Sequence, residues 1–90
     1  MPSPRSETVA VLPAGVDLHA RPAAQFVRTA MGFSSRIAVR AGEREVDAKS
    51  LLSVLSLGAK SGTALRLRAE GDDADGAVAR LAGCVAALTE

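Results

Sequence analysis

Hydrophobic and polar residues alternate along residues 35–41 and 63–70, and this period of two is typical of strands with one face in solvent. Residues 8–12 form a β-branched and aliphatic run that ends at a Pro-Ala-Gly segment, which predicts an edge or outer strand. Residues 43–47 follow the turn residue Gly42 and predict a short return strand. The inward positions of the two alternating segments are Ile37, Val39, Leu65, Leu67 and Ala69.

Three other stretches carry apolar residues at the spacing of a helical face. The first covers residue 20 to residue 30 or 31, with Gly32 as its C-terminal stop, and the second covers residues 49–57 and ends at Gly58. The third begins in an acidic segment whose negative charge suits a helix N-terminus, namely Asp72, Asp73 and Asp75. Its predicted buried stripe comprises Ala77, Val78, Leu81, Val85 and Leu88.

The predicted order is therefore β-α-β-β-α-β-α, an α+β fold. A four-stranded antiparallel sheet with helices on one face is the economical way to bury these apolar stripes. It leaves the arginines of the second and fourth strands in solvent. Residues 1–7 are polar and contain two prolines, so we expect a flexible leader before a single domain at residues 8–90.

Composition excludes several classes of function. With 48% hydrophobic residues and a net charge of +1, the chain can bury a core but gives no case for nucleic acid or an anionic membrane. No apolar run approaches the roughly 20 residues that span a bilayer, and no metal-ligand cluster is present in the sequence. The lone Cys84 forms no internal disulfide and falls on the stripe of the last helix, where we expect buried packing. These features predict a cytoplasmic protein without membrane insertion.

His19, the only histidine, directly precedes the first predicted helix, and Arg21 and Pro22 follow it. The fixed φ of proline suits a first helical turn. The first N–H groups of a helix have no intrahelical partner and favour bound anions. His19 beside a guanidinium at such an end can hold a phosphoryl group on a ring nitrogen while amides and Arg21 hold its oxygens. A structural role at the helix start is the alternative for His19, and the sequence does not choose between its nitrogens.

The segment Leu18-His19-Ala20-Arg21-Pro22-Ala23 resembles the active-site signature of the HPr family, the histidine-containing phosphocarriers of the bacterial sugar phosphotransferase system. A second block, residues 48–58, resembles the serine-site segment of that family at the expected separation. The resemblance extends from about Thr8 to the C-terminus. It implies an open-faced β-sandwich that acts as a monomeric, stoichiometric carrier and not as an enzyme, with no cofactor. Phosphate would pass from enzyme I to Nδ1 of His19 and then to enzyme IIA proteins.

The resemblance also implies which residues surround His19. Arg21 and the helix start would support the phosphoryl group, with Ala20, Pro22 and Ala23 forming that start. An apolar partner-binding patch would combine Ala20, Ala24, Leu51, Leu52, Leu55 and Gly58, with Gln25, Arg28 and Lys49 around it. Leu52 is the leucine we expect to be exposed, because three leucines of one short helix cannot all reach the core. Core packing is the alternative for Leu51 and Leu55.

Ser50 has two interpretations. As a helix N-cap its hydroxyl would accept a backbone N–H, typically worth about 1 kcal/mol. In some HPr relatives the matching serine is phosphorylated by a dedicated kinase, which weakens carrier activity and creates a regulatory signal. Two alternative functions follow: a carrier of a regulatory or dihydroxyacetone-kinase branch, or an allosteric module that signals through phosphorylated Ser50.

The chain departs from the family pattern near His19. Asp17 stands where relatives usually have glycine, and the preceding loop is about one residue longer. Aspartate tolerates left-handed backbone better than most residues, so we expect the turn to survive. Its carboxylate would either favour imidazolium at His19 or repel a phosphoryl group. Met31 and Ser53 stand where many relatives have lysines, which makes the rim of the patch less basic.

Overall fold

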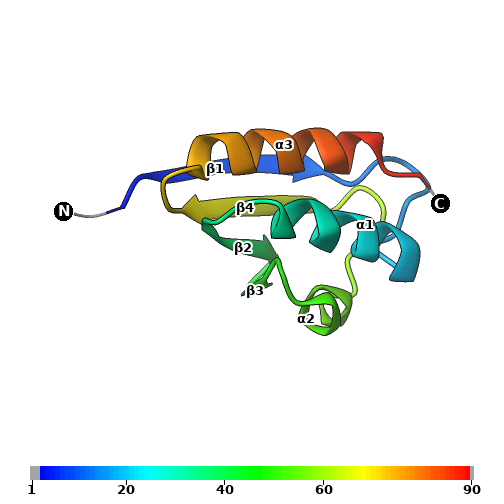
Figure 1. The fold of residues 1–90 in the computed structure, drawn as a ribbon. Coiled ribbons are helices and arrows are strands. Elements are labelled where there is room, and N and C mark those ends of the chain that lie inside the picture. Colours follow the sequence, from blue (N-terminus) through cyan, green and yellow to red (C-terminus); the bar gives the residue numbers. More distant parts are fainter. Residues whose placement is uncertain (1–2, 90) are drawn as a thin grey trace.

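The computed structural model describes residues 3–89, and the elements in that range follow the predicted order (Figure 1). The strands are β1 (Arg5–Val11), β2 (Arg36–Ala41), β3 (Arg44–Asp47) and β4 (Ala64–Glu70). The helices are α1 (Ala20–Met31), α2 (Leu51–Ser56) and α3 (Ala74–Ala87).

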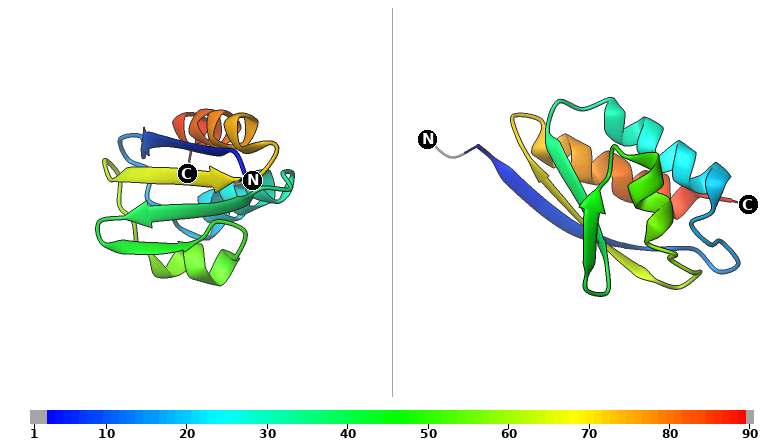
Figure 2. Two further views of the ribbon diagram at one scale, coloured as in Figure 1. Left: turned by 90° about the vertical axis from the view of Figure 1, so that its left-hand side faces the viewer. Right: turned by 90° about the horizontal axis from the view of Figure 1, so that it is seen from below.

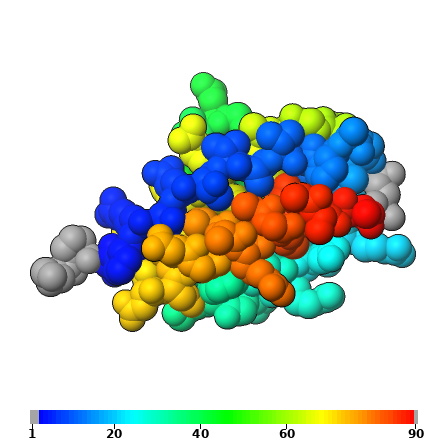
Figure 3. Space-filling model, turned by 90° about the horizontal axis from the view of Figure 1, so that it is seen from above, coloured from blue at the N-terminus to red at the C-terminus, as the bar shows by residue number. Residues whose placement is uncertain are grey.

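The strands form one antiparallel sheet in the order β1-β4-β2-β3. All three helices lie on the same side of this sheet, and its other face is open (Figure 2). Helix α3 packs on β1 and β4 and contacts α1, while the short α2 lies against α1 and β3. From above, α3 occupies the middle of the surface between the segments of β1 and α1 (Figure 3). The predicted fold class is confirmed.

The core lies between the sheet and the helices, and it is built by the two periodicities of the sequence. The five predicted inward strand residues are buried, whereas Arg66 and Arg68 between them are exposed on the open face. The predicted stripe of α3 is also buried. From α1, Phe26 is the largest fully buried side chain of the described residues. Helix and strand patterns therefore meet in a single core.

Strand β1 begins earlier than predicted, so residues 5–7 belong to the sheet and not to a leader. Arg5 pairs with Glu70 of β4 in the ladder, and its Nε donates to Oε2 of Glu70 at 2.7 Å. The N–H of Gly71 donates to the carbonyl of Pro4, which continues the contact beyond the strand. The sequence did not predict this part of the strand for two reasons. Its residues are polar, and the residues with which they pair, 68–70, are far away in sequence. Residues 1 and 2 of the predicted leader and residue 90 of the predicted domain lie outside the described range.

Asp73 is the N-cap residue of α3, yet its side chain makes no bond to that helix. Its carboxylate instead accepts hydrogen bonds from the backbone N–H and the hydroxyl of both Ser34 and Ser35, in the loop after α1. These bonds, led by the Ser35 hydroxyl, lower the pKa of Asp73 to about 2. Asp73 therefore ties two loops together, where the sequence predicted only a charge at a helix start.

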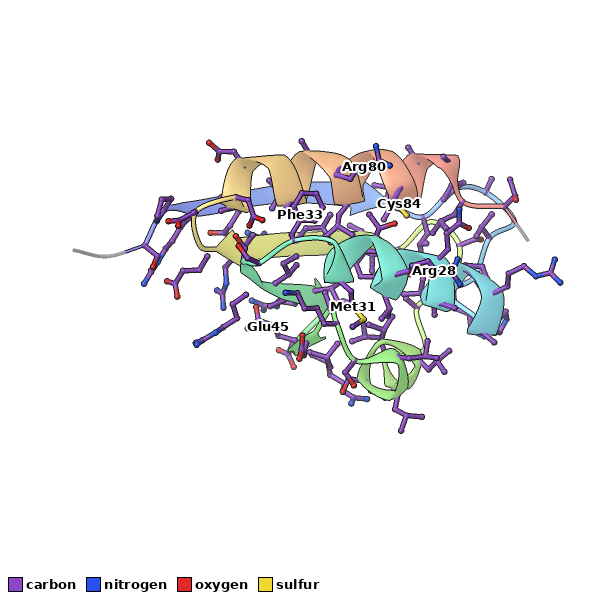
Figure 4. The ribbon with its side chains drawn as sticks, viewed as in Figure 1. Arg28, Met31, Phe33, Glu45, Arg80 and Cys84 are labelled. Carbon is purple, nitrogen blue, oxygen red and sulfur yellow. The ribbon has the colours of Figure 1, made fainter. Side chains whose placement is uncertain are left out.

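Cys84 lies between α3 and α1 (Figure 4). It is half-buried and packs against the edge of the core, and Oγ1 of Thr29 contacts its Sγ at 3.6 Å. The predicted packing role is confirmed, although burial is partial. The proximity of Cys84 Sγ to the Thr29 hydroxyl makes the cysteine a contact between the two long helices.

Candidate functional site

His19 is the N-cap residue of α1 and has extended backbone, with φ −84° and ψ −172°. Its carbonyl accepts the N–H of Ala23 at 2.8 Å, while its imidazole makes no capping bond. The preceding Leu18 is buried, and its N–H donates to the carbonyl of Ala59 at 2.9 Å. The backbone on both sides of His19 is therefore anchored, while its side chain is 68% exposed. This arrangement presents the ring to an incoming molecule.

Asp17 lies between the His19 ring and the loop before β4. Its Oδ2 is 3.4 Å from Nε2 of His19, and its Oδ1 accepts the backbone N–H of Ser61 at 2.8 Å. The Ser61 bond is the main cause that holds the pKa of Asp17 below its ordinary value, and the charges of Lys60 and His19 act in the same direction. Asp17 is thus a fixed carboxylate beside one nitrogen of the ring.

The expectation that Asp17 adopts a left-handed backbone is wrong. No described residue other than glycine has a positive φ, and Gly15 carries the reversal of this loop at φ +79°. Gly15, two positions before Asp17, supplies the left-handed residue of this loop. Asp17 is therefore free to use its side chain, and no backbone strain holds it.

The first turn of α1 offers two backbone N–H groups, those of Ala20 and Arg21. Pro22 has no N–H, and the Ala23 N–H is already bonded to the His19 carbonyl. Ala23 is also fully buried. The prediction that Ala23 supports a phosphoryl group is therefore wrong, and Pro22 contributes shape only.

Arg21 is exposed beside these amides. Within residues 3–89, no hydrogen bond or ion pair occupies its guanidinium. A shallow depression at the helix start is lined by Asp17, His19, Ala20, Arg21 and Pro22. The sequence-predicted pair His19 and Arg21 thus meets at one concave, open place where an anion can be held by amides and a guanidinium.

Helix α2, which packs against α1, exposes an apolar surface. Leu52 is 81% exposed as predicted, and Leu51 is 40% exposed, so the alternative of core packing is wrong for Leu51. Leu55 is half-buried and packs against the core, while Val54 is the fully buried residue of α2. Other exposed members of the predicted patch are Ala20, Gln25, Arg28 and Gly58, and Ala24 is half-buried.

Lys49 differs from its predicted place at the rim of the patch. It is half-buried, and its Nζ donates to the carbonyl of Phe33 at 2.7 Å. The ammonium closes the loop after α1, which a sequence pattern does not show because the two residues are 16 positions apart. Arg28 is then the basic side chain left exposed at the rim.

Ser50 is the N-cap residue of α2, and its Oγ accepts the N–H of Ser53 at 3.3 Å. The predicted capping role is confirmed. Its half-buried hydroxyl lies directly before the exposed Leu51 and Leu52. A modification of Ser50 would therefore alter the edge of the apolar surface.

The sequence did not indicate the support that residues 59–63 give to the loop before His19. Leu12 and Thr63 are joined by one backbone hydrogen bond, Gly62 and Leu12 by another, and Ala59 bonds to Leu18. Pairing between two irregular loops has no local signature.

Among the described residues, no group of three or more potential ligands gathers for a metal ion. No helix in that range has the length and apolar character to cross a membrane.

Comparisons with known proteins agree on one family. The family model described as the phosphorylation site of the HPr component of the PTS matches residues 6–87. The chain is 44% identical over 71 residues to phosphocarrier protein HPr of Haemophilus influenzae, covering 79% of this chain and 84% of that protein. It is also 44% identical over 85 residues to a multiphosphoryl transfer protein of Xanthomonas campestris. That match covers 94% of this chain but only 10% of the relative, so the chain spans about a tenth of that protein.

Solved structures give the same result. HPr-C-His from Thermoanaerobacter tengcongensis superposes with a TM-score of 0.85 at 41% identity, covering 90% of this chain and 91% of that one. The phosphocarrier protein HPr from Bacillus anthracis also gives 0.85, at 32% identity, covering 90% and 96%. With a histidine and an arginine at the start of α1 and sequence matches along nearly the whole chain, the chain belongs to the HPr family and is a phosphocarrier of the phosphotransferase system.

Proposed function

We propose that His19 is the phosphoryl acceptor of this carrier and that Nδ1 is the phosphorylated atom. The observation that carries the proposal is the placement of an exposed imidazole at the start of α1, beside two backbone N–H groups and the Arg21 side chain. In a transfer, the bond between phosphorus and the donor atom breaks while a ring nitrogen forms the new N–P bond. The amides of Ala20 and Arg21 and the guanidinium then donate to the phosphoryl oxygens.

The partners in this proposal are enzyme I as donor and enzyme IIA proteins as acceptors. The exposed Leu51 and Leu52, on the helix that packs against α1, support a docking surface of modest size, as a carrier that must release each partner requires. The docking partner also supplies much of the positioning for the transfer. We propose that the chain acts as a monomer in the cytoplasm, where phosphoenolpyruvate is available.

Regulation through Ser50 and a role in a dihydroxyacetone-kinase branch stay predictions. A phosphate on Ser50 would put negative charge beside Leu51 and Leu52, and this position favours an effect on docking rather than on the His19 ring. A dedicated serine kinase is the partner that this alternative requires. The acceptor that takes phosphate from His19 would distinguish the branches.

The relay is tested by labelling. Purified enzyme I, radiolabelled phosphoenolpyruvate and an enzyme IIA protein are mixed with the wild type, with His19→Ala or with Ser50→Ala. We expect label to reach the enzyme IIA protein with the wild type and with Ser50→Ala, but not with His19→Ala. Transfer through the His19→Ala variant would contradict the proposal.

A further inference from the structure

We infer that Asp17 is a positioning residue for His19, which keeps a proton on Nε2 so that Nδ1 gives and takes the phosphoryl group. The inference rests on the proposed function, and it assigns a role to a residue that departs from the HPr pattern. The supporting geometry is the 3.4 Å separation between Oδ2 and Nε2 and the anchoring of Oδ1 by the Ser61 N–H at 2.8 Å.

The anchoring decides which oxygen faces the ring. Because Oδ1 is bonded to the backbone of the loop before β4, Oδ2 is directed at Nε2 without a competing bond among the described residues. Two cations surround this arrangement: Lys60, whose charge acts on Asp17, and Arg21, which borders the same depression. The Ser61 bond and the Lys60 charge hold the pKa of Asp17 below its ordinary value, so the carboxylate is ionised at neutral pH.

A carboxylate beside one ring nitrogen sets the tautomer. It favours the form with hydrogen on that nitrogen, and the other nitrogen keeps its lone pair. In Ser-His-Asp sites the aspartate has this effect and also stabilises the imidazolium that forms. In this chain the favoured tautomer carries hydrogen on Nε2, so the nucleophilic lone pair is on Nδ1.

The same contact acts during transfer. When Nδ1 attacks phosphorus and the donor bond breaks, the ring keeps its Nε2 proton and becomes cationic, and the Asp17 carboxylate faces that charge. When the N–P bond breaks in the onward step, the ring leaves as neutral imidazole, a better leaving group than an imidazolide anion. The two nitrogens direct their lone pairs away from each other, so a phosphoryl group on Nδ1 points away from Asp17. Support of the imidazolium thus outweighs repulsion of the phosphoryl group.

The first test measures the tautomer. Nitrogen-15 NMR of the His19 ring above its titration range reports which nitrogen carries hydrogen in the wild type, in Asp17→Asn and in the control Asp75→Asn. Asp75 lies in the first turn of α3, which begins at the opposite end of the molecule from the start of α1 (Figure 1). We expect the ratio of the Nε2–H to the Nδ1–H form to fall about three- to fivefold in Asp17→Asn and not in the control, because the carboxylate stabilises an N–H on the nitrogen that it faces.

The second test measures phosphorylation without a partner protein. Phosphoramidate donates its phosphoryl group to the ring and releases its protonated amino group as ammonia, and intact mass follows the gain. We expect Asp17→Asn to react about three- to fivefold more slowly than the wild type, and Asp75→Asn at the wild-type rate. Asparagine keeps an oxygen for the Ser61 N–H, so the loop is preserved while the charge is removed.

These experiments distinguish a failure of the role of Asp17 from a failure of His19 as the phosphoryl acceptor. Equal tautomer ratios and rates in the wild type and Asp17→Asn, with phosphate on His19, overturn the role of Asp17 alone. Acid-labile phosphate that persists in His19→Ala overturns the proposed function itself. If Asp17→Asn does not fold, the wild type still decides: an Nε2–H to Nδ1–H ratio no higher than that of a blocked histidine peptide contradicts the inference.

Discussion

Asp17 and Asp73 both lie close to a helix start, and they are bonded in different ways. Both oxygens of Asp73, the N-cap residue of α3, accept hydrogen bonds from Ser34 and Ser35. Asp17, two residues before the N-cap of α1, uses one oxygen for the Ser61 N–H and leaves the other beside the His19 ring. The first carboxylate has both oxygens in hydrogen bonds between loops, whereas the second has one oxygen that faces the His19 ring.

The surroundings of the two helix starts follow the same division. At α3, Ser35 is buried and Gly71 packs closely against it. At α1, the ring of His19 and the Arg21 side chain are exposed around a shallow depression. The polar groups at the start of α3 therefore close two loops, whereas those at the start of α1 stay open to solvent.

The largest effect is expected from Gly71→Ala, at the structural helix start. Gly71 has φ +150°, and an added Cβ would lie 2.6 Å from Oγ and 2.8 Å from Cα of Ser35. We expect the free energy of unfolding to fall by about 2–4 kcal/mol, measured by urea denaturation. Gly83→Ala is the control, because open space surrounds that exposed helical glycine. A Gly71→Ala protein as stable as the wild type would show that the close packing of Gly71 against Ser35 does not stabilise the start of α3.

Arg21→Ala tests the role of the guanidinium at the start of α1. Loss of charge-assisted hydrogen bonds to the phosphoryl oxygens should slow phosphorylation by phosphoramidate about five- to tenfold, with little change in stability. The matched control is Arg80→Ala, which removes an exposed arginine from α3 (Figure 4). An unchanged rate in Arg21→Ala would show that the guanidinium does not contact the transferred group.

Leu52→Ala separates docking from chemistry. Because the side chain is 81% exposed, stability should stay within about 0.5 kcal/mol of the wild type. We expect the KM for phosphorylation by enzyme I to rise about fivefold, as for a residue central to an interface, while the phosphoramidate rate stays unchanged. Val9→Ala, an exposed apolar residue on the open face of the sheet, is the control. An unchanged KM in Leu52→Ala would place docking elsewhere.

The smallest effect concerns acid stability. The pKa of Asp73 is about 2 in the fold against an ordinary value of 3.8, so its ionised form stabilises the protein above the ordinary value. This stabilisation is lost as the pH falls from about 4 towards 2. Melting temperatures measured across that window should fall less steeply in Asp73→Asn than in the wild type. If the melting temperature fell less steeply with pH in Asp17→Asn than in Asp73→Asn, Asp17 and not Asp73 would be the aspartate that stabilises the fold more.

The fold followed from local pattern because each buried stripe has a regular period. Ile37 and Val39 marked one strand, and the stripe that ends at Leu88 marked the last helix. Residues 5–7 were missed because their polar side chains pair with a distant strand. A period of two identifies a strand by its apolar positions, and residues 5–7 have none.

The site could be predicted only where its residues are close together in the sequence. His19 and Arg21 are neighbours in sequence, and the structure brings them together at the helix start as predicted. The bond from Ser61 to Asp17 spans 44 positions and leaves no trace in the sequence. Ala23 was misassigned because its amide is used by the carbonyl of His19, a detail of the cap that composition does not reveal.

The most direct test of the account is the intact mass of the wild type and of His19→Ala after incubation with enzyme I and phosphoenolpyruvate, before and after mild acid. We predict that the wild type gains about 80 Da, the mass of one phosphoryl group, that acid removes it because an N–P bond is labile, and that His19→Ala gains nothing. An acid-stable gain, or a gain in His19→Ala, would show that another residue carries the phosphate.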